Sequence, residues 1–279
     1  MLGVIGGTGL YRMEALTDVQ KRRVETPFGA PSAEVTLGVF EGNPVAFLPR
    51  HGLHHQFLPS EINYRANIWA LKSLGVKRIM SVSAVGSLNA AIRPGDLAIP
   101  NQYLDWTSGQ RRPTFFGEGV VAHISSSQPT CDLLSQLVCK AAAEVKIQIH
   151  SNKTYVCVEG PRLGTRAESF FFKNNGCDLV GMTNVPEVFL ALEAQIAYCT
   201  LAVVTDYDCW LEDPKEHVSV DKVMALYMNS IEKVQMVLKR VFVKPFDEEK
   251  SESRRSLQGA LVTQTIPEDK SEMVRVLKL

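Results

Sequence analysis

Short, continuous apolar runs recur along the chain, and segments with helically spaced apolar residues lie between them. The runs are rich in valine and isoleucine, which is typical of strands that helices cover on both faces. They predict strands at residues 2–6, 44–50, 78–85, 96–100, 154–160, 178–182 and 197–205.

The intervening segments carry an amphipathic helical pattern. In the first of the long ones, Ile62, Ala66 and Trp69 fall near helical spacing, and Gly75 is a typical residue to end a helix. The pattern predicts helices at residues 61–74, 132–146, 165–175, 185–195 and 219–240. Because strands and helices alternate without an internal repeat or a linker, residues 1–244 are expected to form one α/β domain, with a largely parallel or mixed sheet between helices.

The last part of the chain, residues 245–279, has a different composition. Its first stretch, FDEEKSESRRS, is charged and poor in apolar residues, as solvated segments are. Apolar residues return at 257–262 and 273–279. This charged tail is therefore predicted either to dock as a short helix or to stay partly disordered, and the pattern leaves both open.

Composition narrows the functional class. The chain has 30 basic and 30 acidic side chains, and this balance disfavours binding to nucleic acid or to anionic membranes. No apolar run approaches the roughly 20 residues of a membrane span, and the N-terminus lacks the pattern of a signal peptide. Six scattered cysteines without zinc-ligand spacing predict reduced thiols, no metal site and a cytoplasmic location.

Four glycines stand in the stretch GVIGGTGL, which begins within the first apolar run. A dinucleotide fingerprint would need a third glycine where Arg12 stands, and the P-loop pattern also fails. The stretch then predicts either a tight turn or a turn whose N–H groups and Thr8 hydroxyl hold a small anion.

Other predicted strands also end in residues that suit an oxyanion. Arg50 and His51 stand in PRHGLHH, Ser83 stands in SAVGSL, and Thr183 stands in GMTNVPE at the start of a predicted helix. Each has a structural alternative: His54 is expected to be a surface histidine, Ser83 an ordinary strand end, and Thr183 or its neighbour a helix cap.

Two carboxylates, Asp206 and Asp208, follow the apolar strand LAVV, with aromatic residues between and after them. Strand ends of this kind are where open α/β sheets build sites. Two acids close together repel, so one should have a raised pKa and be able to donate a proton. A turn or a cap is the alternative, and the flanking aromatic residues favour a site.

Together, the stretches GVIGGTGL, PRHG, NYRANIWALK, SAVGSL, VEGPRLGTRAE, GMTNVPE and TDYDCW resemble the purine nucleoside phosphorylase family of trimeric type, in order over residues 1–240. The resemblance implies a mixed, partly barrel-like sheet flanked by helices. It also implies a homotrimer with active sites near subunit interfaces, and neither a metal nor an organic cofactor. The resemblance implies that phosphate contacts Thr8, Arg50, His51, Ser83, Ala84 (through its backbone) and Thr183. It implies that the ribose contacts Met182 and that the base contacts Asp206 and Asp208. It also implies that the 5′ group or a subunit interface involves His55, His123, Val220 and Val223.

The implied reaction is phosphorolysis of a nucleoside, with Asp206 donating to purine N7 and Asp208 as its partner. The resemblance implies S-methyl-5′-thioadenosine as the substrate, giving adenine and 5-methylthioribose 1-phosphate, and two acids suit the 6-amino group of its adenine. Leu163 and Gly164 stand where adenine-specific members tend to have Phe-Ser, so S-methyl-5′-thioinosine or another 6-oxopurine nucleoside is the alternative. A nucleosidase that uses water and a nucleoside-binding scaffold remain as other classes.

Overall fold

The computed structural model describes residues 1–7, 16–211 and 219–279. The strands are β1 (Leu2–Gly6), β2 (Thr17–Arg22), β3 (Val35–Phe40), β4 (Asn43–Pro49), β5 (Arg78–Ser87), β6 (Leu97–Trp106), β7 (Ile149–Val158), β8 (Leu179–Gly181) and β9 (Ala197–Asp206). The helices are α1 (Tyr64–Ser73), α2 (Asp132–Glu144), α3 (Arg166–Asn174), α4 (Asn184–Glu193), α5 (Val220–Val243) and α6 (Glu268–Lys278), with short 3₁₀ turns η2 (Glu248–Lys250) and η3 (Glu252–Arg255).

Within these residues the strands form one mixed sheet in the order β2-β3-β4-β1-β5-β8-β7-β6-β9. A further parallel pairing of β5 with β9 joins its end back to its middle, so β5, β8, β7, β6 and β9 close on themselves. The α/β class and the mixed, partly barrel-like sheet flanked by helices are therefore confirmed.

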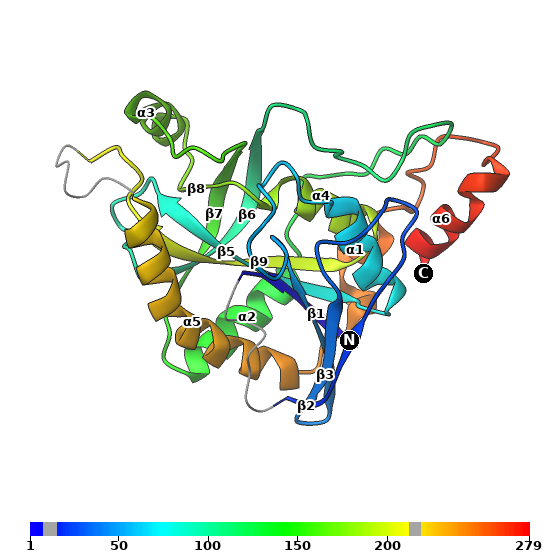
Figure 1. Cartoon of the computed structure of the whole chain (residues 1–279), viewed down its shortest axis with the longest axis horizontal. Helices are drawn as coiled ribbons and strands as arrows, with labels where there is room; N and C mark the ends of the chain where they lie inside the picture. The colour runs from blue at the N-terminus through cyan, green and yellow to red at the C-terminus, as the bar shows by residue number, and fades with distance from the viewer. Residues whose placement is uncertain (8–15, 212–218) are drawn as a thin grey trace.

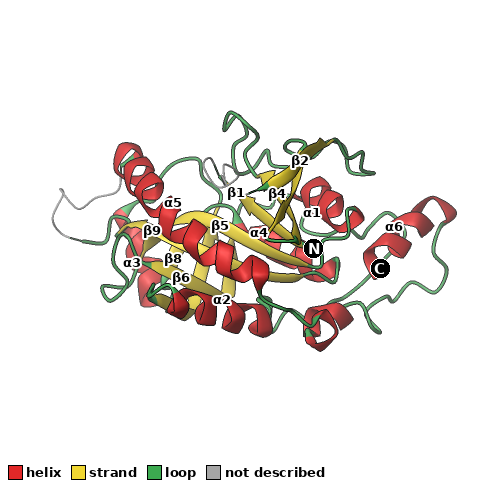
Figure 2. Cartoon of the chain, turned by 90° about the horizontal axis from the view of Figure 1, so that it is seen from below, coloured by secondary structure: helices red, strands yellow, loops and turns green. Residues whose placement is uncertain are grey.

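Alternating side chains of β1 show how the helices cover the sheet. Leu2 and Val4 belong to the core under α2 and α5, whereas Ile5 belongs to the core under α1 and α4. Figure 1 shows α2 and α5 below the sheet and α1 and α4 above it. Seen from below in Figure 2, α5 crosses over β5 and β9. All five residues of β1 are buried, as its unbroken apolar sequence predicts.

The sequence did not predict the strands β2 and β3. All six residues of β2 are exposed, because β2 is the edge strand of the sheet. Its neighbour β3 has a mixed pattern of buried and half-buried residues, without the continuous apolar run of the predicted strands. The strand predicted at 96–100 continues to Trp106, since pairing with β7 extends it through polar and exposed residues.

Residues 245–279 pack against the rest of the chain. Leu257, Met273 and Leu277 belong to the same core cluster as α1 and α4, and the side chain of Gln195 donates a 3.1 Å hydrogen bond to the Leu277 carbonyl. Figure 1 shows α6 at the end of the molecule opposite α3. Among the described residues, no helix is both long and apolar enough to cross a membrane.

Candidate active site

A cavity of about 390 Å³ opens where the C-terminal ends of β1, β4, β5 and β9 approach the start of α4. Among the described residues, those that line it and that the sequence singled out are Arg50, His51, His55, Ser83, Ala84, Leu163, Gly164, Met182, Thr183, Asp206, Asp208, Val220 and Val223. Thr8 lies outside the described residues, although its neighbour Gly7 lines the cavity.

His123 lies apart from this cavity. Its side chain is exposed, and its backbone N–H donates to the Ala260 carbonyl at 2.9 Å. Its expected contact with a neighbouring subunit stays a prediction.

One end of the cavity is built around Arg50, which is only 1% exposed. Its Nε and Nη2 atoms donate to the two carboxylate oxygens of Glu187 at 2.7 and 2.8 Å. Nη2 also donates to Ser81 Oγ at 2.6 Å, and Nη1 donates to the Val82 carbonyl at 3.0 Å. A guanidinium has five N–H groups, so one on Nη1 remains for a ligand. Burial alone would lower the pKa of Arg50, but the charge and hydrogen bonds of Glu187 outweigh it and raise the pKa above its ordinary value.

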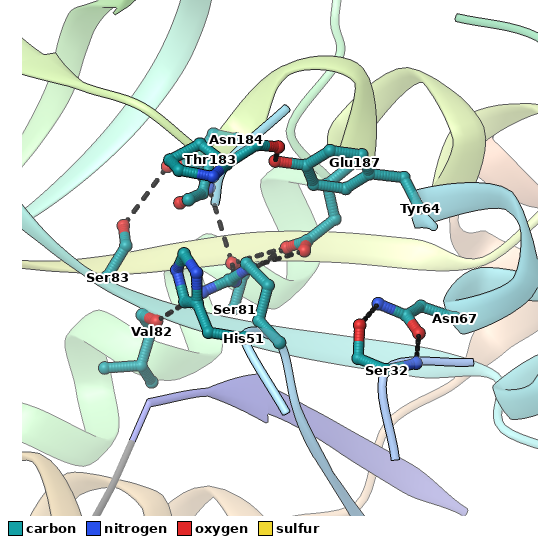
Figure 3. Close-up of polar contacts among 12 residues, drawn as sticks. Ser32, His51, Tyr64, Asn67, Ser81, Val82, Ser83, Thr183, Asn184 and Glu187 are labelled. Atoms are coloured by element: carbon teal, nitrogen blue, oxygen red, sulfur yellow. Dashed lines mark hydrogen bonds and ion pairs between the residues drawn. The ribbon is translucent and has the colours of Figure 1, made fainter. Parts of the chain in front are cut away.

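Glu187 was not identified from the sequence. It is fully buried in the first turn of α4, and Ser81 Oγ and Tyr198 Oη also donate to it, at 2.8 and 2.9 Å. Figure 3 shows its side chain reaching from α4 toward Ser81. An acid after a proline at a helix start is common for electrostatic reasons alone, so its local sequence carries no sign of a buried partner.

The hydroxyl residues take distinct positions. Ser83 Oγ donates to Asn184 Oδ1 at 3.2 Å, so it is connected to the start of α4 (Figure 3). Thr183 occupies the N-cap position, yet its side chain makes no cap hydrogen bond and lines the cavity instead. Thr183 is therefore the N-cap residue by position, but its side chain does not cap the helix. Asn184 does not serve as a cap either, because its side chain donates to Tyr198 and Thr200 in the core.

The ring of His51 is positioned by a backbone carbonyl and by a second histidine ring. Its Nδ1 atom lies 2.9 Å from the Phe57 carbonyl oxygen, and its ring stacks on His55 with 4.3 Å between ring centroids. Burial lowers the pKa of His51 to about 4, and the Arg50 charge acts in the same direction.

The two acids lie at the other end of the cavity, and both are buried. Asp206 accepts from Thr205 Oγ1 and from the Asp208 backbone N–H, both at 2.7 Å. Burial raises the pKa of Asp206 to about 6, and the charge of Asp208 adds a smaller contribution. Burial also raises the pKa of Asp208, whose carboxylate accepts from Ser169 Oγ. The expectation of a raised pKa is therefore supported, but burial, rather than repulsion between the acids, is its main cause.

Arg111 is a second residue that the sequence analysis missed. It is 6% exposed, and its Nη1 donates to the carbonyls of Met182 and Val185 at 2.8 and 2.6 Å. These carbonyls flank Thr183, so Arg111 holds the turn that presents Met182 and Thr183 to the cavity. In the sequence it stands beside Arg112 and resembles part of a solvated basic pair.

Apolar side chains of α5 form the outer wall of the cavity. Val220 and Val223 line it as expected, and Met224, Tyr227 and Met228 continue the same wall. Val220 and Met224 are 66% and 47% exposed, so this wall faces both the cavity and the outside.

Gly86 packs tightly behind the acids, and this gives a stability prediction. A Cβ at Gly86 would lie 2.9 Å from Asp206 Oδ1 and 3.1 Å from Val180 Cγ1, so Gly86→Ala should lower the free energy of unfolding by about 1–3 kcal/mol. A Cβ at Gly164 would lie 3.4 Å from Asp208 Oδ2, an ordinary contact, so Gly164→Ala is the matched control. Urea unfolding measures both, and equal midpoints for the two variants would contradict the tight packing at Gly86.

Comparisons with known proteins agree with this geometry. The chain belongs to the phosphorylase superfamily, whose family model matches residues 1–242. It is 46% identical to the S-methyl-5′-thioadenosine phosphorylase of Geobacter sulfurreducens, over 99% of this chain and 97% of that protein. It is also 46% identical to the enzyme of the same name from Thermosynechococcus vestitus, over 94% of this chain and 91% of that protein.

Solved structures give the same result. A methylthioadenosine phosphorylase from an Antarctic soil metagenomic library is similar with a TM-score of 0.92 and 43% identity, covering 99% of this chain and 98% of that chain. The methylthioadenosine phosphorylase of Schistosoma mansoni, solved in complex with adenine, is similar with a TM-score of 0.82 and 38% identity, covering 86% and 90% of the two chains.

Proposed function

We propose that this chain catalyses the phosphorolysis of S-methyl-5′-thioadenosine by inorganic phosphate, which yields adenine and 5-methylthioribose 1-phosphate. The observation that carries the proposal is one cavity that Arg50 and Thr183 line at one end and the acids Asp206 and Asp208 line at the other. This cavity occurs in a chain that is similar, over 99% of its length, to a relative named S-methyl-5′-thioadenosine phosphorylase. None of the relatives named above supports the 6-oxopurine alternative.

At the first end, inorganic phosphate would contact the free Nη1 hydrogen of Arg50, Ser83, the backbone of Ala84 and the Thr183 hydroxyl, with Thr8 as a further expected donor. Phosphate held there attacks C1′ of the ribose while the bond from C1′ to N9 breaks. The negative charge of the phosphate stabilises the positive charge that develops on the sugar. Because the phosphate is already bound beside C1′, the two reactants do not have to meet from solution.

At the second end, negative charge develops on the departing purine. The raised pKa of Asp206 allows its carboxyl group to carry a proton near neutral pH and to donate it to N7. Thr205 Oγ1 lies 3.2 Å from the Val85 carbonyl and 2.7 Å from Asp206 Oδ2, so its single hydrogen can serve either oxygen. It can therefore accept from the protonated acid before the transfer and donate to the carboxylate afterwards.

Asp208 is the expected partner for the 6-amino group. Its carboxylate accepts one hydrogen bond from Ser169 and can accept more from a ligand, because Asp208 lines the cavity. Gly164, next to this carboxylate, has no side chain to fill the space. A 6-oxopurine would bring a second acceptor to the same place, and an unpaired buried acceptor is costly.

The remaining assignments belong to the same proposal. The apolar wall of α5 with Val220 and Val223 would receive the methylthio group, with His55 beside the sugar. We expect a cytoplasmic homotrimer in which His123 approaches the 5′ group in a neighbouring subunit. Phosphate is a co-substrate, and the reaction as written balances without a metal or an organic cofactor.

Product analysis with S-methyl-5′-thioadenosine tests the proposal. Adenine and a sugar phosphate should form only when phosphate is present, and hypoxanthine release from the inosine analogue should be much slower. Adenine release without phosphate would instead identify a nucleosidase, and binding without turnover would identify a nucleoside-binding protein.

A further inference from the structure

The hydrogen bond of His51 determines which of its ring nitrogens carries a proton. A carbonyl oxygen can only accept, so the 2.9 Å contact between Nδ1 and the Phe57 oxygen requires the hydrogen to be on Nδ1. The other nitrogen, Nε2, is then a bare acceptor whenever the ring is neutral. Neutral His51 therefore cannot donate a hydrogen bond from Nε2 to an oxyanion, although it lines the cavity at the Arg50 end.

The charges around this end do not match a phosphate dianion. Arg50 is the only lysine or arginine among the described residues that line the cavity, and the buried carboxylate of Glu187 already balances its charge. In the part of the chain that the structure describes, the other titratable side chains that line the cavity are His55, which stacks on the His51 ring, Tyr227 on α5, and the two acids at the far end. None of these described groups supplies a fixed positive charge, so the described residues by themselves compensate two negative charges at this place poorly.

We propose that this site binds phosphate together with one additional proton, which is shared between Nε2 of His51 and a phosphate oxygen. Dihydrogen phosphate on neutral His51 and hydrogen phosphate on protonated His51 are two descriptions of this one state. The inference rests on the proposed function, because it takes inorganic phosphate as the bound co-substrate. The proton is not consumed: C1′ bonds to a different phosphate oxygen as its bond to N9 breaks, and the proton leaves with the sugar phosphate or stays on His51.

The free protein does not hold this proton in advance. The pKa of His51 is lowered to about 4, mainly by burial; the charges of Arg50 and His55 act in the same direction, while the Phe57 carbonyl and Glu187 oppose the shift. At neutral pH the ring is therefore neutral, and the proton must arrive with the anion or from solvent. The apparent KM for total phosphate should then rise about tenfold per pH unit above the second pKa of phosphate. A site for the dianion alone would show no such rise.

Sulfate isolates the contribution of the protein, because it carries no proton at neutral pH. Calorimetric titration of the full-length chain with sulfate at pH 7, in two buffers of different ionisation enthalpy, counts the protons taken up on binding. We expect about one proton per sulfate in the wild type. The variant His51→Gln offers an amide N–H that needs no extra proton, so it should bind the anion with no uptake.

Two further variants make the result specific. His54→Gln changes an exposed histidine on the same loop that does not line the cavity, and it should take up the same proton as the wild type. Asp206→Asn removes the cavity acid whose pKa burial raises to about 6, and it should also retain the uptake. Sulfate binding to the wild type without proton uptake, or uptake lost in Asp206→Asn and kept in His51→Gln, would overturn the inference. Failure of the wild type to bind either sulfate or phosphate would count against the proposed function itself.

Discussion

Replacing Asp206 with asparagine is expected to lower kcat for S-methyl-5′-thioadenosine by about 10²–10⁴-fold, the usual contribution of a positioned general acid. Asparagine can donate a hydrogen bond but cannot transfer a proton to N7 of the departing adenine. Steady-state kinetics at saturating phosphate measure the effect. The KM for phosphate should change much less, because Asp206 lies at the opposite end of the cavity from Arg50.

The pH profile separates this role from a structural one. Asp206 donates only when protonated, so kcat/KM of the wild type for the nucleoside should fall as pH rises through its pKa of about 6 in the free protein. Asp206→Asn should lack this limb, and Asp105→Asn, at an exposed acid on β6, should keep it. If Asp206→Asn and the wild type cleaved adenosine and inosine analogues equally well, the assignment of Asp206 would be wrong.

Replacing Glu187 with alanine is expected to lower the free energy of unfolding by about 3–5 kcal/mol, because it leaves the Arg50 charge buried without its partner. The same change should raise the KM for phosphate much more than the KM for the nucleoside. Two of the hydrogen bonds that orient the guanidinium are lost, so its remaining N–H no longer points reliably into the cavity. Urea unfolding and initial rates at varied phosphate measure the two effects.

Glu272→Ala is the control, because Glu272 pairs with Arg275 on the exposed surface of α6, where ion pairs contribute little. It should leave both the unfolding midpoint and the KM for phosphate unchanged. Glu187→Gln keeps two polar side-chain groups in place of the carboxylate and should lie between alanine and wild type in phosphate KM. Wild-type stability and phosphate KM in Glu187→Ala would show that the buried pair neither supports the fold nor orients Arg50.

Strands and helices that bury apolar surface were predictable from the sequence. The strand predicted at 2–6 is β1, and the helices predicted at 61–74 and 132–146 are found as α1 and α2 with slightly shorter bounds. The edge strand β2 was not predictable from the sequence. It is exposed along its whole length, so its six residues need not alternate between apolar and polar. Thr183 holds the N-cap position, but only the fold shows that its side chain lines a cavity built by strands distant in the sequence.

The sequence by itself determined the α/β class, the chemical types at the strand ends and the resemblance to nucleoside phosphorylases. These follow from apolar periodicity and from short motifs, which are local properties of the chain. Only the tertiary structure decided that Glu187, 137 positions from Arg50, neutralises it. Likewise, only the structure shows that Phe57 fixes the proton on Nδ1 of His51 and that burial makes Asp206 a weaker acid. Charge pairing, tautomers and desolvation depend on which atoms the fold brings within a few ångströms, and no local pattern carries that information.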